Sequence, residues 1–320
     1  MSHVANVVDY GADPLGEVDS STAFEAAQQA SNDIFVPNGL YLKEAETKIV
    51  SGKTWTFDGA TIIHSRDTAT MFSAEDAKDW NILGHLRLYG LLTTSADTGE
   101  CGFRIKNPKR AYIERITVDR FKGTGIVVDG MLYQTRGDKL TIGSIAAYSN
   151  YQGFDFRPES GAEYLSIDSI DAVQNIYAGT ISAGNCQIRG GNITDNYYGL
   201  LLGSGLNHGH GGLHGMNLNH NVYWNLKAEN VEAGFTLNGC HVFADDASTG
   251  KIILQDSKGV SIRDGIVEAA IENSGRVGKN MLQDNYISGD GVTRVGGIDP
   301  DSLIRIGNYD SQGMWGLNNR

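Results

Sequence analysis

Six stretches between residues 142 and 270 repeat one nine-residue pattern: IGSIAAYSN (142–150), IDSIDAVQN (167–175), IRGGNITDN (188–196), LHGMNLNHN (213–221), LNGCHVFAD (237–245) and IRDGIVEAA (262–270). Successive repeats start 25, 21, 25, 24 and 25 residues apart. The first residue of each is aliphatic, the sixth is aliphatic or alanine, and the ninth is asparagine in the first four. Self-similarity at a period of roughly 20–50 residues is typical of a repeat architecture.

The length of the repeat selects the architecture. A coil of about 24 residues is too short for a pair of helices, which needs about 33 or more. Apolar residues alternate along the chain, as in Leu165/Ile167 and Phe235/Leu237, which indicates strands. Short strands with Gly and Asn at the corners predict an all-β fold, a parallel β-helix whose coils stack about 4.8 Å apart. We expect one buried column to contain Ile167, Ile188, Leu213, Leu237 and Ile262.

Looser frames extend the stack in both directions. They start at Phe57, Leu83, Ile113 and Leu282, so the expected number of coils is about ten. Residues 121–141 and 203–212 interrupt the pattern as insertions. Insertions in a solenoid form loops on one face, which is often the binding face.

The N-terminal 40 residues carry the most specific motifs: VVDYGAD (7–13), Gly16, DSSTAFEAA (19–27) and IFVPNGLYL (34–42). Ser20 or Ser21 is placed to cap a short helix that runs to about Ala30. A strand, a turn and a second strand are expected over residues 34–42.

These motifs resemble the opening of the pectate-lyase-superfamily repeat proteins, many of which are bacteriophage tailspikes or polysaccharide-degrading enzymes. The resemblance implies a single-stranded, right-handed parallel β-helix. It implies an N-terminal strand and capping helix over residues 1–45, coils over 46–302, and a C-terminal cap or tail over 303–320. It also implies a homotrimer located in a virion tail or outside the cell.

The composition limits the partners. A net charge of −12 and a pI near 5.1 disfavour nucleic acid and anionic membranes, although a local basic column could still hold an acidic polysaccharide. No apolar run approaches the roughly 18 residues of a membrane span, and the N-terminus lacks the features of a secretory signal. Cys186 and Cys240 fall on inward positions and are expected to be buried thiols. No cofactor is expected.

The repeat register also predicts a functional face. Outward second positions carry Glu114, Gly143, Asp168, Arg189, His214, Asn238 and Arg263, and fifth positions carry Asp171, Asn192, Asn217 and His241. We expect Asp168 and Asp171 to act as an acid and a base, Arg189 to hold or neutralise an anionic substituent, and His214 to be a second proton carrier. The predicted substrate-binding residues are Glu114, Asn192, Asn217, Asn238, His241 and Arg263. The alternative is that these side chains are simply the solvated faces of strands.

Three other groups are weaker candidates. The histidines at 208, 210, 214 and 220 suggest a metal, but the glycine-rich loop gives them no fixed geometry, and we expect none. Asp195 and His220 share a corner position and could form either a catalytic pair or a salt bridge, of which the salt bridge is favoured. Aromatic residues for sugar binding are present but form no clear row: Tyr148, Tyr151, Tyr197, Tyr223 and Trp224.

The sequence therefore favours a polysaccharide depolymerase, either a glycoside hydrolase or a polysaccharide lyase, that acts on a bacterial surface glycan as phage tailspikes do. The alternative is a β-helix spike protein without catalysis, which binds a glycan or receptor or serves as a structural spacer. Fold alone does not separate these, because function depends on the site.

Overall fold

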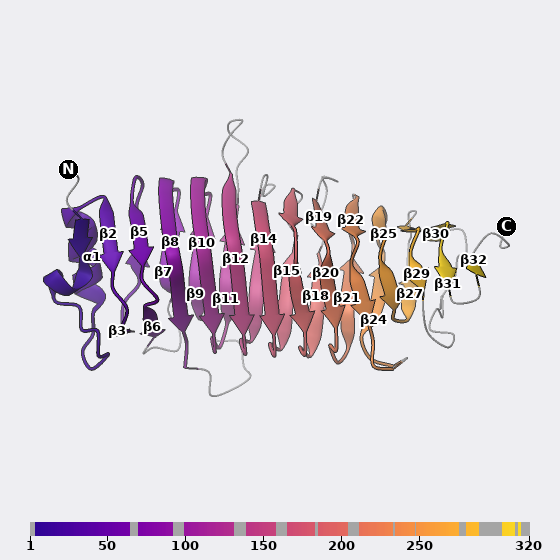
Figure 1. The fold of residues 1–320 in the computed structure, drawn as a ribbon, viewed down its shortest axis with the longest axis horizontal. Coiled ribbons are helices and arrows are strands. Elements are labelled where there is room, and N and C mark those ends of the chain that lie inside the picture. Colours follow the sequence, from indigo (N-terminus) through magenta and orange to yellow (C-terminus); the bar gives the residue numbers. More distant parts are fainter. Residues whose placement is uncertain are drawn as a thin grey trace.

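The structure is a computed structural model that describes residues 4–64, 70–91, 99–130, 139–157, 165–182, 185–203, 211–232, 234–246, 248–274, 280–287, 303–310 and 313–314. These residues wind into a parallel β-solenoid of about nine turns. The stack is elongated, with the helix at one end and the last strands at the other (Figure 1). The predicted parallel β-helix is confirmed, although the sequence frames had suggested about ten coils.

The strands lie on three faces, and, with the exception of the last strand, each pairs in parallel with a strand of a neighbouring turn. Face 1 consists of β1 (Val4–Asn6), β2 (Asp33–Val36), β5 (Thr54–Phe57), β8 (Lys78–Tyr89), β10 (Lys109–Asp119), β12 (Leu140–Tyr148), β14 (Leu165–Val173), β16 (Cys186–Ile188), β19 (Gly211–His214), β22 (Phe235–Asn238), β25 (Val260–Arg263), β28 (Asn280–Gln283) and β30 (Leu303–Ile306). Face 2 consists of β3 (Leu40–Lys43), β6 (Thr61–His64), the second halves of β8, β10, β12 and β14, then β17 (Gly191–Thr194), β20 (Met216–Asn219), β23 (His241–Phe243), β26 (Ile266–Glu268), β29 (Tyr286–Ile287) and β31 (Tyr309–Asp310). Face 3 consists of β4 (Thr47–Lys48), β7 (Thr70–Glu75), β9 (Cys101–Lys106), β11 (Thr124–Asp129), β13 (Gln152–Arg157), β15 (Tyr177–Ile181), β18 (Tyr198–Leu202), β21 (Trp224–Glu229), β24 (Lys251–Gln255) and β27 (Ile271–Ser274).

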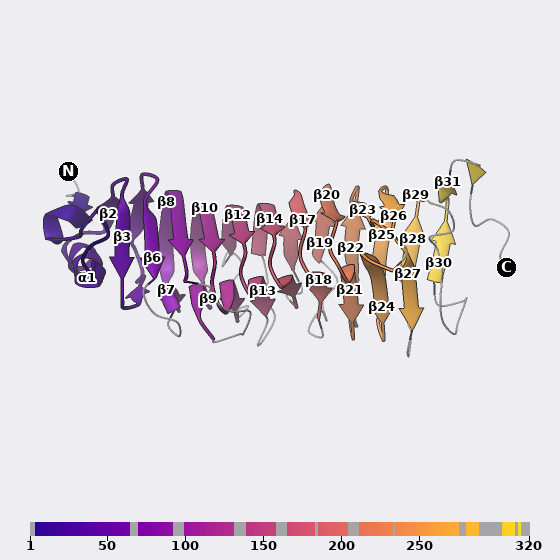
Figure 2. The same ribbon diagram turned by 90° about the horizontal axis from the view of Figure 1, so that it is seen from below.

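Faces 1 and 2 form one continuous sheet. Strands β8, β10, β12 and β14 run through both faces, whereas each later turn uses two short strands with a bend between them. The result is a 22-stranded sheet that includes β32 (Gly313–Met314), which pairs with β31 in the antiparallel direction. Face 3 is a separate 10-stranded sheet (Figure 2). Strand β11 falls inside residues 121–141, so part of that predicted insertion is a regular strand of face 3.

The predicted core column is confirmed. Ile167, Ile188, Leu213, Leu237 and Ile262 are register partners in successive turns, and each is at most 1% exposed. Burying one such aliphatic side chain contributes about 1.5–3 kcal/mol. The periodic apolar positions of the sequence therefore supply much of the stabilisation that holds neighbouring turns together.

The ninth-position asparagines form a buried ladder at the corner between faces 2 and 3. The side-chain oxygen of Asn175 accepts hydrogen bonds from the amide (2.9 Å) and side chain (3.0 Å) of Asn150, and Asn196 does the same for Asn175. Each side-chain nitrogen also donates to a backbone carbonyl, such as Ala172 for Asn196 (3.0 Å). The ladder confirms the predicted corner role of asparagine.

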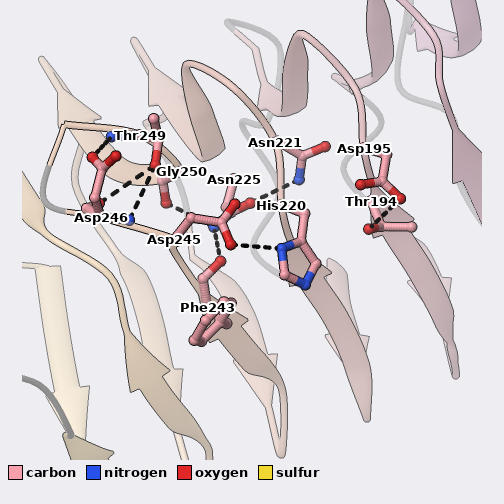
Figure 3. A network of polar contacts seen from close by, with 10 residues as sticks. All are labelled: Thr194, Asp195, His220, Asn221, Asn225, Phe243, Asp245, Asp246, Thr249 and Gly250. Carbon is pink, nitrogen blue, oxygen red and sulfur yellow. Dashed lines mark hydrogen bonds and ion pairs between the residues drawn. The ribbon is translucent and has the colours of Figure 1, made fainter.

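The ladder ends at Asn221, and a different asparagine closes it (Figure 3). Asn221 donates to the side chain of Asn225 at 2.7 Å, and Asn225 in turn donates to the carbonyls of Phe243 and Gly250, each at 2.7 Å. The next ninth position, Asp245, is thereby released from the interior, and its side chain is 56% exposed. A second ladder begins further along, where Asn285 bonds to Asn308.

Helix α1 (Ser21–Ala30) lies at the N-terminal end, after the short 3-10 helix η1 (Val7–Tyr10). Its Phe24 is fully buried and packs against Tyr41, Trp55 and Phe72, with ring centroids 5.8–6.2 Å apart. The bounds of α1 agree with the predicted helix, but Ser20 does not cap it through its side chain. The Ser20 hydroxyl instead accepts the amide of Asp13 at 3.0 Å, which ties the preceding loop to the helix.

The strands predicted on either side of Pro37 are present, and they lie on different faces of the solenoid. Strand β2 pairs with β5 on face 1, and β3 pairs with β6 on face 2. The segment is therefore the first bend between two faces. In the described part of the chain no helix has the length and apolar character to span a membrane. Cys101, Cys186 and Cys240 are free and buried, as expected for the last two.

Candidate functional site

The candidate residues lie in two columns on neighbouring faces. Column 1, on face 1, contains Asp168, Arg189, His214, Asn238 and Arg263, and column 2, on face 2, contains Asp171, Asn192, Asn217 and His241. The register partners His214, Asn238 and Arg263 follow one another in successive turns, as do Asp171, Asn192, Asn217 and His241. The residue before each member of column 1 and the residue after each member of column 2 are buried in the core, so the side chains of the two columns face outward.

Column 1 begins with an ion pair. The guanidinium of Arg189 donates to Asp168 at 2.9 Å and to the hydroxyl of Ser166 at 2.7 Å, and both charged side chains are more than half exposed. His214 makes a different contact, with the side chain of Gln187 at 2.9 Å. The structure thus brings the predicted acid and arginine together, and it orients His214 through another residue.

Column 2 is a row of oriented amides. Asp171 accepts the side-chain amide of Asn192 at 2.8 Å, and the side-chain oxygen of Asn192 accepts that of Asn217 at 2.9 Å. In the next turn, His241 contacts Glu268 at 2.9 Å. The row therefore has a carboxylate at each end, Asp171 at one and Glu268 at the other. Glu268 had not been singled out from the sequence.

Glycines form the bend between the two columns. Gly191, Gly215 and Gly239 have φ values of 118°, 63° and 64°, which favour a residue without a Cβ. A Cβ on Gly191 would stand 1.9 Å from the carbonyl oxygen of Ile170, so the close approach of successive turns excludes any larger residue. The strip between columns 1 and 2 consequently carries no side chain at these positions, which leaves the backbone accessible to a ligand.

Glu114 lies on the N-terminal side of this face, where its carboxylate accepts the amide of Gly84 at 2.7 Å. The nearby turns of faces 1 and 2 are basic. Arg115 is the register partner of His85, and Arg87 also acts on His85. Burial and the charges of these two arginines lower the pKa of His85 to about 4, so the imidazole is neutral at pH 7. This is a local positive region in an acidic protein.

One acid on this face was missed from the sequence. Asp119, at the end of β10, is the register partner of Tyr148, and its pKa is raised by burial. Burial and the charges of Asp171 and Asp119 also raise the pKa of Tyr148. The tyrosine is therefore close enough to both carboxylates to feel their charge. No periodic pattern indicated this acid, because its half-buried environment depends on the strands around it.

His220 does form a pair with an acid at the corner, but the acid is Asp245 and not the predicted Asp195. Nδ1 of His220 contacts Oδ1 of Asp245 at 2.8 Å, whereas Asp195 accepts a hydrogen bond from Thr194 at 3.2 Å (Figure 3). Asp195 and His220 both adopt left-handed backbone conformations, at φ 58° and 53°. Asp245 is available as the partner because Asn225 takes its place in the buried network.

Three of the aromatic residues noted in the sequence, Tyr151, Tyr223 and Trp224, belong to a row that Tyr177 and Tyr198 complete. Tyr148 and Tyr197 make none of its ring contacts. Tyr151, Tyr177 and Tyr198 follow in successive turns, and Tyr198 contacts both Tyr223 and Trp224, with ring centroids 4.5–5.5 Å apart. The Tyr177–Tyr198 and Tyr198–Tyr223 pairs are nearly parallel, at 16° and 19°. In these two pairs the ring faces pack against each other and are not available to a sugar. The row therefore stabilises a corner more than it offers a binding surface. Each member follows a ninth-position asparagine by one to three residues, and that varying offset hid the row.

The suggested histidine cluster is not assembled by the residues that can be placed. His208 and His210 lie outside the described residues, and His214 and His220 contact different partners, Gln187 and Asp245. Among the residues that the structure describes, no group of three or more His, Cys, Asp or Glu side chains could hold a metal ion.

No protein-family model matches this chain, and no curated protein sequence matches it. Among solved structures, it is similar to the A-module of the mannuronan C-5 epimerase AlgE4 of Azotobacter vinelandii, with a TM-score of 0.72 and 17% identity over 98% of each chain. It is also similar to the catalytic unit of a GH87 α-1,3-glucanase from Streptomyces thermodiastaticus (TM-score 0.62, 12% identity, 99% of this chain and 70% of that one).

A third similar structure is the N-terminal fragment of gene product 12 of bacteriophage Phi29, with a TM-score of 0.53, 14% identity, and coverage of 97% of this chain and 72% of that one. Identities of 12–17% show the fold alone. The chain is a right-handed parallel β-helix, as the resemblance to the pectate-lyase superfamily implied.

Proposed function

We propose that this chain is a polysaccharide depolymerase of the phage tailspike type that acts on a bacterial surface glycan. The observation that carries the proposal is the oriented row of column 2, in which Asp171, Asn192 and Asn217 are joined by side-chain hydrogen bonds of 2.8–2.9 Å. A polymer lying along the stack meets these groups at each turn, about 4.8 Å apart. Two of the similar structures are named for action on polysaccharides, which supports a glycan as the ligand.

Each charged residue of the two columns has a proposed role in the reaction. Asp168 and Asp171 are the proposed proton-transfer pair, with Arg189 holding an anionic substituent and His214 as a second proton carrier. Asp119 is a further candidate for the general acid, since burial raises its pKa. A carboxyl group whose pKa is raised toward the working pH is suited to act as a general acid. The residues proposed to bind the sugar chain are Glu114, Asn192, Asn217, Asn238, His241 and Arg263.

The two possible reactions use the residues differently. Hydrolysis requires one carboxyl group to protonate the leaving oxygen and another to activate water or attack the sugar. In β-elimination a base removes a proton beside a sugar carboxylate, and Arg189 or His214 would serve. The basic region around Arg87 and Arg115 lies three or more turns from these two residues, about 14 Å or more along the stack, so it would hold the carboxylate of a different sugar in the same polymer. The basic region makes an acidic polysaccharide a suitable substrate for either reaction.

The test is incubation of the full chain with a panel of bacterial capsular, lipopolysaccharide and exopolysaccharide preparations. Size-exclusion chromatography measures chain shortening, and ultraviolet absorbance detects the unsaturated product of a lyase. We expect at least one acidic polysaccharide to be shortened. If none is shortened although one binds, the depolymerase proposal is wrong.

Binding without catalysis is the second candidate, and one observation favours it. Asp168 is held in an ion pair with Arg189, and Asp171 accepts two hydrogen bonds from Asn192, so both carboxylates already have partners. Groups arranged in this way suit recognition of sugar hydroxyls as well as proton transfer. Binding in the same panel without shortening is the result that this candidate predicts.

A further inference from the structure

A cavity opens on face 3, away from columns 1 and 2, near the N-terminal end of the stack. Its volume is about 420 Å³, and strands β4, β7 and β9 contribute to its walls. Pockets that hold small ligands measure about 300–1,000 Å³, so the cavity has the size for a small molecule. The proposed depolymerase chemistry uses none of the residues that line it.

Three side chains of this cavity form a row across successive strands. Lys48 is the register partner of Ser73, and Ser73 is the register partner of Arg104. At about 4.8 Å per strand, the two cationic residues are about 10 Å apart along the sheet, with the serine between them. The long side chains of lysine and arginine can reach a ligand placed over the serine from both sides.

Other charges in the cavity wall already have partners. Lys106 pairs with Glu75 at 3.0 Å, and Asp76 accepts a hydrogen bond from Asn107 at 3.1 Å. These contacts neutralise Lys106 and Glu75 and orient Asp76. Besides these paired groups and Ser51, which accepts the amide of Lys78, a ligand would meet the row of Lys48, Ser73 and Arg104 together with Glu46.

The row retains unused hydrogen-bonding capacity. Within the described part of the chain, neither the ammonium group of Lys48 nor the hydroxyl of Ser73 has a hydrogen-bond or ion-pair partner. Arg104 approaches Asp129 at 3.7 Å, beyond hydrogen-bond length, and Asp129 is shared with Arg157 at 3.9 Å. A guanidinium has five N–H donors, so Arg104 can still bind an anionic oxygen group.

The wall also offers an acceptor. Glu46 lines the same cavity and, among the described residues, forms no ion pair. A carboxylate accepts hydrogen bonds from hydroxyl groups, whereas it repels a second anion. The cavity therefore combines two cationic groups around a serine with the carboxylates of Glu46 and Asp76 as acceptors of hydroxyl protons, a combination that suits a hydroxylated ligand with a single anionic group.

We propose that this cavity binds an acidic sugar, with its anionic group between Lys48 and Arg104 over Ser73 and its hydroxyls toward Glu46. The anionic group is a carboxylate, as in a uronic acid, or a phosphate on a sugar. The site is separate from columns 1 and 2, so it gives the protein a second contact with an acidic glycan. Simultaneous occupation of two sites on one polymer raises the overall affinity without any new contact.

The experiment is a calorimetric titration of the full chain at low salt with galacturonate, glucose 6-phosphate, galactose and inorganic phosphate. We expect galacturonate or glucose 6-phosphate to bind at least about tenfold more tightly than galactose, because a charge-assisted hydrogen bond is lost in the neutral sugar. The preferred sugar acid shows whether the site favours a carboxylate or a phosphate. Equal binding of galactose overturns the proposal, and so does inorganic phosphate that binds as tightly as both sugar acids.

Four variants locate the binding. Lys48→Met, Arg104→Gln and Ser73→Ala should each weaken sugar-acid binding, the first two by about tenfold or more. Lys227→Met removes one positive charge from another part of face 3 and is the matched control, which should keep the parent affinity. Ser73→Ala removes only a hydroxyl and keeps the fold testable if a charge variant unfolds. Full affinity in Lys48→Met and Arg104→Gln, or an equal loss in the control, contradicts the site.

Discussion

Asp171 accepts two hydrogen bonds from Asn192, one from its backbone amide at 3.2 Å and one from its side chain at 2.8 Å. The carboxylate is therefore fixed against the strand of the next turn while remaining on the outward face. A fixed, accessible carboxylate can act as a base or as an anchor, and the two roles respond differently to removal of its charge.

Replacing Asp171 with Asn should separate these roles. If Asp171 transfers a proton, turnover of a cleaved polysaccharide should fall by about 10²–10⁴, whereas substrate binding survives because the shape is kept. Asp168→Asn and Asp119→Asn, assayed in parallel, show which carboxyl group is its counterpart. Initial rates and binding titrations provide the measurement, and Asp58→Asn, an exposed turn residue, is the control. Full turnover in all three acid variants would place the chemistry elsewhere.

Leu213 tests the core register. Leu213→Ala should lower the free energy of unfolding by about 2–5 kcal/mol, because a fully buried aliphatic side chain leaves a cavity between the turns. Leu213→Asp should cost more, since it buries an unpaired charge. Arg263→Ala, on the outward side of the same face, should change stability by less than about 0.5 kcal/mol. Urea denaturation measures all three, and a Leu213→Asp protein as stable as the parent would refute the register.

Removing one asparagine from the buried ladder should lower the free energy of unfolding by more than the loss of a single hydrogen bond. Asn196→Ala removes the acceptor for Asn175 and the donors to Ala172 and Asn221. Each buried polar group left without a partner costs about 1–3 kcal/mol, so we expect a loss of several kcal/mol. The control is Asn219→Ala, in the next turn, two residues before the ladder residue Asn221 and on the outward side. A double-mutant cycle between positions 175 and 196 should show coupling, and additive effects would argue against a connected ladder.

Lys43 makes stability depend on pH in a defined direction. It is fully buried beside the rings of Phe24 and Phe72 and donates to Thr47 at 2.6 Å, and burial lowers its pKa to about 8. Below pH 8 the lysine is charged in both the folded and the unfolded chain, so the folded state bears the full free-energy cost of burying the charged ammonium group. Between pH 8 and about 10.4 only the unfolded chain keeps the proton, so this cost disappears and stability rises.

Lys43→Met removes that dependence. At pH 7 the variant should be more stable than the parent by about 1–2 kcal/mol, since the loss of contacts between the cation and the rings offsets part of the gain. The difference should shrink as the pH is raised from 8 to 10. Thermal unfolding at several pH values is the measurement, with Lys53→Met, a lysine outside the core, as the control. A difference that stays constant over this range would show that Lys43 does not titrate as described.

The assembly expected of a tailspike-like protein is a homotrimer, and we propose the same for this chain. Light scattering at micromolar concentration should then give about three times the monomer mass of 34.5 kDa. The measurement should be repeated at high salt, because a trimer held by apolar contacts should persist there. A mass of one chain at every concentration would exclude the trimer.

The repeat was sufficient to predict a parallel β-helix because it marks the buried positions directly, whereas the right-handed turn was implied only by the family resemblance. An aliphatic residue recurs at the first position of every repeat, and such side chains are stabilised by burial. The register that buries all of them stacks Ile188 on Leu213. Asn196 could be assigned to a corner on the same ground. The outward columns followed from the alternation of the strands, which places Asp171 and Asn192 on one face without any knowledge of their contacts.

Contacts between non-equivalent positions could not be predicted in this way. His220 pairs with Asp245 only because Asn225, from a different strand, replaces an expected ladder residue. The raised pKa of Asp119 depends on its half-buried position, and the contact of Tyr151 with Tyr177 depends on a one-residue change in offset between the two turns. These features arise where a turn departs from the repeat, and a pattern built from the repeated positions does not include such departures.

The end of the first asparagine ladder, at Asn221, has a consequence for how the molecule opens. In a solenoid each turn contacts only its neighbours, so cooperativity passes along the stack through one junction at a time. At the junction after Asn221 the buried amide chain is replaced by the single bridge through Asn225. The turns before and after this point should therefore behave as two units in local unfolding, with amide hydrogens on the C-terminal side exchanging first.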